Sequence, residues 1–257
     1  MPVESLLVRG RRTRALPAGR SATVPSPMLV AAATAVAAAM LLPLAYLLLR
    51  AAGVGLEKAL AELFSARTLA ITWNSVLLAF LVTAISLAIS LPLAWLTVRT
   101  DLPGRRIWSV LLALPLVIPT YVGAYALISM MGPRGIVQGW LEPLGVEQLP
   151  SIYGLPGATW ALTIFSYPYI FLSLRAGLIN MDPAQEEAAR SLGLSPLRVF
   201  WRVTLPNLRP AIASGALLLA LYVLSDFGAV ALMRYNSFTR AIYIQYQSSF
   251  DRSLAAL

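Results

Sequence analysis

The sequence predicts an all-α integral membrane protein, and three observations support that class. Hydrophobic residues make up 58% of the 257 residues and charged residues 12%, which is far from the composition of a soluble domain of this length. Apolar runs of about 20 residues recur, each long enough as a helix to cross a bilayer. Arginines gather in alternate connections between these runs. We expect a bundle of about five complete transmembrane helices and the start of a sixth.

The elements follow from the order of polar and apolar segments. Residues 1–27 hold five arginines among Pro, Gly and Ser, which predicts a disordered cytoplasmic tail, and residues 28–257 are expected to form one transmembrane domain. The spans are predicted over residues 28–49, 76–98, 107–131, 155–179 and 211–233. An outer amphipathic helix is expected within 50–73, and a short interfacial helix over 137–144 within an outer loop, 132–154. The chain turns apolar again only at its last few residues, so we expect it to be a truncated piece of a longer protein.

Basic residues indicate the orientation in the membrane. The tail, the connection at 99–106 and the segment 175–209 hold 13 of them, whereas the alternate connections hold 7. Because basic residues favour cytoplasmic loops, the N terminus is predicted to be inside.

The longest polar passage between apolar runs covers residues 182–210, and it predicts two short helices joined by a glycine elbow. Asp182 can cap the first helix, Pro183 suits its first position, and Gln185 can complete a capping box. Gly193 suits a left-handed stop.

The second helix is expected to begin with Ser195 and Pro196 and to end at Pro206. One face of the first helix carries little apolar area: Gln185, Ala188, Ala189 and Leu192 fall at i, i+3, i+4 and i+7. Two interpretations remain open for this passage, an ordinary helical loop between spans or a docking element for a soluble partner.

The same passage resembles the EAA loop of the membrane subunits of bacterial ATP-binding-cassette (ABC) importers. The resemblance rests on Glu187, Ala188, Ala189, Gly193, Val203, Leu205 and Pro206 at their fixed offsets, with Val203 where the family usually has Ile. It implies that the loop is a cytoplasmic coupling helix that fits a groove on an ATPase subunit. Glu187 would then make a polar contact to the ATPase, Ala188 and Ala189 would permit close approach, and Gly193 would form the elbow.

Further segments resemble the ferric-iron permeases, in which two homologous halves are fused in one chain. They are TDLPGRR, LPLVIPTYVGAYA, the LPG and YPY of the fourth span, SDFGAV and SFTRAIY. Thiamine, sulfate and polyamine permeases share parts of this pattern. The resemblance implies a type I ABC importer permease-like bundle in a bacterial inner membrane, matching the first half of an iron permease. Its partners would be a cytoplasmic ATPase dimer, a periplasmic substrate-binding protein and a second permease half.

Several residues within the spans are candidates for a translocation path. Pro115 and Pro119 interrupt the third span, and such breaks are tolerated in lipid where a neighbouring helix or polar cavity satisfies the freed carbonyls. Tyr121 and Tyr125, one turn apart, either line a path or anchor the span at the interface. Asp226 lies inside the fifth predicted span, where a carboxylate either belongs to the path or accepts hydrogen bonds from a neighbouring helix or outer-loop water.

The sequence lacks His and Cys, which removes the usual metal ligands and the side chains of thiolate and imidazole catalysis. We therefore expect no metal site, no cofactor and no enzymatic activity in this chain. A phosphate-binding loop needs Gly before its lysine, but Glu57 precedes Lys58, the sole lysine. ATP is accordingly expected on a partner subunit.

The sequence disfavours three other classes of function. A net charge of +9 is explained by membrane orientation, so no nucleic-acid partner is expected. A proton-coupled secondary transporter would use Asp226 as its relay, but the other predicted span interiors offer no ionisable partner for it. A membrane enzyme is disfavoured because no carboxylates cluster in the spans.

Overall fold

The computed structural model of the chain describes residues 26–53, 55–132, 135–146 and 148–248. Within these ranges the regular elements are all helical: α1 (Pro27–Ala52), α2 (Leu56–Leu63), α3 (Ala66–Arg99), α4 (Arg105–Leu111), η1 (Leu114–Val117), α5 (Thr120–Met131), α6 (Ile136–Leu141), η2 (Glu142–Leu144), α7 (Leu155–Ser166), α8 (Pro168–Asn180), α9 (Ala184–Ser191), α10 (Pro196–Val199), η3 (Phe200–Thr204), α11 (Leu205–Asn207), α12 (Arg209–Ser225), α13 (Gly228–Leu232) and α14 (Phe238–Ser248). The predicted tail, apart from its last two residues, and the predicted start of a sixth span lie outside the described residues.

The number of spans agrees with the sequence prediction. Three helical stretches are long and apolar enough to cross a membrane, namely α1, α3 and α7 with α8. Two bent pairs of helices raise the number to as many as five among the described residues. The helices predicted within 50–73 and over 137–144 are present as α2 and as α6 with η2.

The second span starts earlier than predicted, at Ala66 rather than at residue 76. Ser65 caps it, because its Oγ accepts a hydrogen bond from the Thr68 backbone N–H at 3.1 Å. Inside the added turns, the Thr72 and Ser75 hydroxyls donate to carbonyls one turn back. These polar side chains are therefore satisfied within the helix, and they do not mark a loop.

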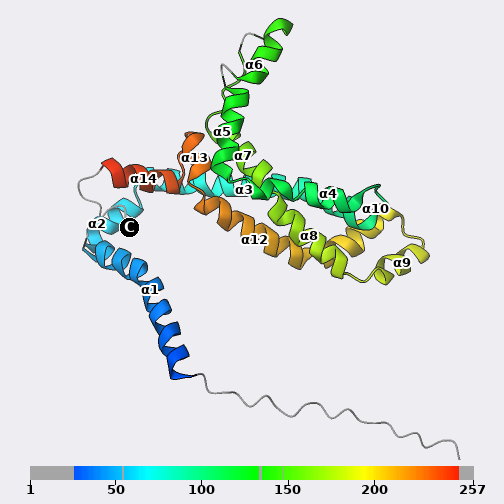
Figure 1. Cartoon of the computed structure of the whole chain (residues 1–257), viewed down its shortest axis with the longest axis horizontal. Coiled ribbons are helices and arrows are strands. Elements are labelled where there is room, and N and C mark those ends of the chain that lie inside the picture. Colours follow the sequence, from blue (N-terminus) through cyan, green and yellow to red (C-terminus); the bar gives the residue numbers. More distant parts are fainter. Residues whose placement is uncertain (1–25, 54, 133–134, 147, 249–257) are drawn as a thin grey trace, which may run out of the picture.

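The third span is broken near its two prolines, as the sequence predicts. Around Pro115 and Pro119 the chain passes from α4 through η1 to α5, and the two halves are bent by 92°. α5 and α6 accordingly stand away from the long helices (Figure 1). The Tyr167 hydroxyl donates to the Leu112 carbonyl at 2.7 Å, so a neighbouring helix does satisfy a backbone group at this break, as expected.

The core of the bundle is formed by α3, α8 and α12, which lie side by side along the long axis of the molecule (Figure 1). Their contact surfaces are fully buried at Leu78 and Val82 of α3, Leu174 of α8 and Leu219 of α12. Gly177 lets α8 approach α12 closely, because a Cβ placed there would lie 2.8 Å from the Ala211 Cβ. α1, in contrast, has none of its apolar window buried within the chain.

The fifth span also differs from its predicted form, 211–233. α12 begins at Arg209 and ends at Ser225, and after two residues the short α13 follows. Asp226 therefore lies at the junction of two helices and not inside one. α5, α7 and α13 pack together at this end of the bundle.

Candidate functional site

The first helix of the polar passage is α9, and Asp182 caps it as predicted. Its Oδ1 accepts a hydrogen bond from the Ala184 backbone N–H at 2.9 Å. Gln185 does not complete a capping box, which corrects the prediction. Its Oε1 instead accepts from Asn207 Nδ2 at 2.9 Å and so connects α9 to α11.

Gly193 forms the left-handed elbow that the sequence predicts. Its φ is +83°, and the backbone N–H groups of Gly193 and Leu194 donate to the carbonyls of Arg190 and Ala189 at 2.9 and 3.2 Å. A Cβ placed on Gly193 would meet nothing within 4 Å. Glycine is therefore required here by the backbone conformation and not by lack of space.

The second helix ends at Asn207, one residue beyond the predicted end at Pro206. Helical winding runs through α10, the π-helical turn η3 and α11 to Asn207, and α12 follows with a bend of 63°. In η3, the Leu205 backbone N–H donates to the Phe200 carbonyl, five residues back. This wider turn accommodates Pro206 within the winding. Ser195 precedes the helix but makes no side-chain capping bond.

The face of α9 that was predicted to be nearly flat is partly exposed and partly buried. Glu187 and Ala188 are exposed and the Leu192 side chain protrudes, with 84% of the residue accessible, whereas Ala189 packs inward with 7% accessible. Leu205 and Pro206 are half-buried on the neighbouring winding. The surface open to a partner is therefore Glu187, Ala188 and Leu192, while Ala189 contributes to the chain's own packing.

A buried ion pair behind α9 was not found from the sequence. Arg99 Nε, at the end of α3, lies 3.3 Å from Glu186 Oε2, and the two side chains are only 13% and 7% accessible. The contact is a charge pair without hydrogen-bond alignment, since Arg99 Nε has no hydrogen-bond partner. Glu186 Oε1 accepts from Thr204 Oγ1 at 2.7 Å, and Arg99 Nη2 donates to the Met181 carbonyl at 3.2 Å. From the sequence, Glu186 appears only as a first-turn acid, and Arg99 only as a basic residue that sets orientation.

Three of the five candidate path residues lie close together. Thr120, which follows Pro119, donates from Oγ1 to Asp226 Oδ2 at 2.5 Å. Tyr121 packs against the start of α13, since a Cβ on Gly228 would lie 2.6 Å from the Tyr121 Cβ. The structure thus brings Pro119, Tyr121 and Asp226 together where α12 ends and α13 begins, while Tyr125 projects from α5 with 64% of its surface accessible.

Asp226 has the partners that its hydrogen-bonding interpretation requires. Besides Thr120, the Ala229 backbone N–H donates to Asp226 Oδ1 at 2.9 Å, so the carboxylate caps α13. The Thr239 hydroxyl donates to the Asp226 carbonyl at 2.7 Å and attaches the start of α14. Through its carboxylate and its backbone carbonyl, Asp226 therefore connects α5, α13 and α14 at one junction.

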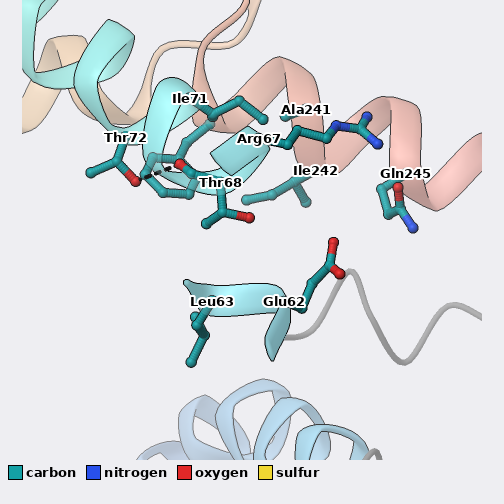
Figure 2. A pocket seen from close by; sticks show the side chains of 10 residues that line it. Glu62, Leu63, Arg67, Thr68, Ile71, Thr72, Ala241, Ile242 and Gln245 are labelled. Carbon is teal, nitrogen blue, oxygen red and sulfur yellow. Dashed lines mark hydrogen bonds between the residues drawn. The ribbon is translucent and has the colours of Figure 1, made fainter. Parts of the chain in front are cut away.

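Pro115 lies apart from that group, beside an apolar hollow of about 790 Å³ between α3 and α7 that Trp160 and Tyr167 also line. A second hollow, of about 310 Å³, lies between α2, the start of α3 and α14. Figure 2 shows Glu62 reaching toward it from α2, with Arg67 and Gln245 on the other side.

Comparison with known proteins supports the resemblance found in the sequence. The family described as "binding-protein-dependent transport system inner membrane component" matches residues 90–256. The Fe(3+)-transport system permease protein FbpB 2 of Haemophilus influenzae is 34% identical over 216 residues, which are 84% of this chain and 39% of that protein. The sulfate transport system permease protein CysW of Escherichia coli is 29% identical over 194 residues, 76% of this chain and 66% of that protein.

The fold is shared with a solved structure. A bacterial alginate ABC transporter, in complex with a periplasmic protein bound to alginate pentasaccharide, contains a chain with a TM-score of 0.72 to this one. The match covers 89% of this chain and 86% of that chain, at 16% sequence identity. Identity this low supports the fold alone. The chain spans about two fifths of the length of its iron-permease relative. Together with the family match, these findings show that the chain belongs to the binding-protein-dependent inner membrane components, the permease family of ABC importers.

Proposed function

We propose that this chain works as the membrane subunit of an ABC importer for ferric iron, with α9 receiving force from a separate ATPase dimer. The observation that carries the proposal is the two-sided construction of α9. Glu187, Ala188 and Leu192 are open to a partner, while Glu186 and Ala189 are buried against the rest of the chain. A helix that is exposed on one side and packed against the chain on the other is suited to pass a displacement from a partner to the rest of the chain.

The coupling proceeds through the ends of α9. The ATPase contacts Glu187 and comes close to the backbone at Ala188, and its closure displaces α9. Gly193 preserves the elbow, and η3 with α11 passes the displacement into α12. The N terminus and α9 lie on the cytoplasmic side of the inner membrane, where the basic residues are concentrated.

The other partners are a periplasmic substrate-binding protein and a second permease half. The second half is supported by the limited coverage of the iron-permease relative, since this chain aligns with only 39% of it. Together with lipid, the second half would cover apolar surface such as that of α1, which is open within this chain. ATP binds to the ATPase partner in this arrangement.

Ferric iron is proposed because the relative with 34% identity over most of this chain is named as an Fe(3+) permease. Sulfate is the second candidate, since sulfate permeases of Escherichia coli and Synechocystis are 29% and 33% identical. Proton coupling through Asp226 gains no support from the geometry, because both carboxylate oxygens are already engaged by Thr120 and Ala229.

Co-purification tests the coupling surface. The permease is expressed with its second half and the cognate ATPase, and Ala188→Trp is compared with Ala213→Trp, an exposed position on α12. We expect Ala188→Trp to remove most of the ATPase, because the large ring prevents close approach, while Ala213→Trp retains it. Equal retention by the two variants would contradict the proposed docking surface.

Proteoliposome uptake tests the substrate. The assembled transporter is supplied with ATP inside and with a binding protein loaded with radiolabelled ferric iron or with sulfate outside. We expect ATP-dependent uptake of iron and not of sulfate. The reverse result would assign the sulfate function.

A further inference from the structure

Arg99 lies where three segments meet at the cytoplasmic end of the bundle. It is the last residue of α3, its Nε lies 3.3 Å from Glu186 of α9, and its Nη2 donates to the carbonyl of Met181, between α8 and α9. The second oxygen of Glu186 accepts a hydrogen bond from Thr204 of η3 at 2.7 Å. One buried carboxylate therefore links the ends of α3, α9 and the winding that leads into α12.

The environment makes this connection stiff. Both side chains are largely removed from solvent, so water cannot readily replace either partner. Glu186 is fixed from two directions, by a cation and by a hydroxyl, which leaves little freedom for its side chain. A solvent-exposed ion pair would be screened and would exchange with water.

Adjacent positions on α9 have opposite surroundings. Glu187 is exposed, while Glu186 is 5% accessible and points to α3 and η3. The chain continues from α8 into α9 and from α9 toward α12, so displacement of α9 reaches those helices through the backbone. α3 ends at Arg99, long before α9 begins at Ala184, and has no such short covalent route. The Arg99–Glu186 pair supplies a direct connection.

We propose that Arg99 and Glu186 are positioning residues that make α9 and the cytoplasmic end of α3 move as one body. A push on α9 then reaches α3 together with α8 and α12, and the three helices of the core move in step. This inference rests on the proposed function, because it assumes that an ATPase moves α9. A merely structural pair would instead stabilise the fold without affecting how ATP hydrolysis is linked to transport.

The chain contains no cysteine, so within it the labels attach only at the two introduced cysteines. Asp101→Cys, two residues beyond the end of α3, and Ser191→Cys, at the end of α9, are both exposed and carry spin labels. The complete complex, with second half and ATPase, is measured by pulsed electron paramagnetic resonance with and without nucleotide. With the native ion pair, we expect the same narrow distance distribution in both states.

The ion pair is then loosened without removal of its charges. Glu186→Asp shortens the carboxylate's reach, and Arg99→Lys removes the donor to Met181, while Arg106→Lys is a matched control on an exposed arginine. We expect the first two variants to retain the ATPase, to broaden the distance distribution with nucleotide, and to move about tenfold less substrate per ATP hydrolysed. Arg106→Lys should behave as the native protein does.

Glu186→Gln provides a second test, because it removes the charge but keeps the side-chain shape. Normal substrate moved per ATP in all three ion-pair variants, even with a lower melting temperature, would overturn the inference and leave a structural role. A changed distance in the native complex on nucleotide binding would also overturn it. If the native permease retains no ATPase, the proposed function itself fails, and this inference fails with it.

Discussion

The two ends of the bundle both use a carboxylate at a junction of helices, but in different ways. At the end that holds α9, which we propose to be cytoplasmic, Glu186 pairs with Arg99 and accepts from the Thr204 hydroxyl, so its contacts reach two other elements. At the other end, which is the outer end in this proposal, Asp226 accepts from the Thr120 hydroxyl and from the backbone N–H of Ala229, three residues ahead. The first is a charge pair between distant segments, and the second is a helix cap with one additional tie.

The two ends therefore differ in what the loss of a charged side chain costs. Loss of one member of the cytoplasmic pair leaves an opposite charge buried without a partner, which is costly in a dry environment. Loss of the outer carboxylate leaves only neutral donors, a hydroxyl and an amide. We therefore expect the cytoplasmic end to depend on paired charges and the outer end on local backbone geometry.

The largest effect is expected from breaking the cytoplasmic pair. Arg99→Leu or Glu186→Leu alone should lower the free energy of unfolding by about 3 kcal/mol, because each leaves a buried charge uncompensated. The double variant should recover a large part of that loss, because no charge then remains. Thermal unfolding in detergent measures the cycle. Losses that simply add in the double variant would show that the two side chains do not interact.

A smaller effect is expected from the outer junction. Asp226→Ala should lower the free energy of unfolding by about 2 kcal/mol, since it removes a helix cap and a charged hydrogen bond to Thr120. Asp226→Asn keeps an oxygen that can accept from Ala229 and should cost less than half as much. The same unfolding assay applies, and the amount of substrate moved per ATP should stay unchanged. If that ratio falls, Asp226 has a role in translocation beyond the junction.

The smallest effect on stability is expected at the elbow. Gly193→Val should cost about 1 to 2 kcal/mol from the left-handed conformation, because a Cβ at this position meets no neighbour. Gly193→Asn should be tolerated better, since Asn adopts this conformation more readily. The melting temperature measures the cost, and uptake measures whether the elbow serves coupling. Uptake in the Val variant equal to the native level would remove Gly193 from the proposed coupling route.

The features that the sequence predicted correctly depend on near neighbours. Apolar length identified α1 and the α7–α8 span, and the Asp182 cap and the Gly193 elbow each require only a few residues of local sequence. Offsets within the EAA-like loop also lie in one short passage, which is why family membership could be predicted before the fold was known.

The features that the sequence did not predict, or predicted wrongly, depend on how the chain packs in the folded structure. Arg99 and Glu186 are in contact although several helices separate them in the sequence, and no periodic pattern relates their positions. Ser195 has the cap-then-proline pattern, but its hydroxyl makes no cap. The Tyr167 hydroxyl satisfies the Leu112 carbonyl near the break at Pro115 and Pro119, and no local pattern identifies Tyr167 as the donor. In each case, only the folded structure shows which groups meet and which do not.

The π-helical turn η3 determines which side chain faces the carboxylate of Glu186. Inward positions on this winding fall at Val199, Thr204 and Leu208, all almost inaccessible to solvent. An uninterrupted α-helical period would place Val203 inward after Val199, since neighbours on one face recur every three or four residues. The extra residue rotates the helix by one position, so a hydroxyl replaces an isopropyl group at the contact. A sequence alignment that assumes one continuous α-helical repeat through this segment would therefore assign the wrong residues to the buried face, either before or after the turn.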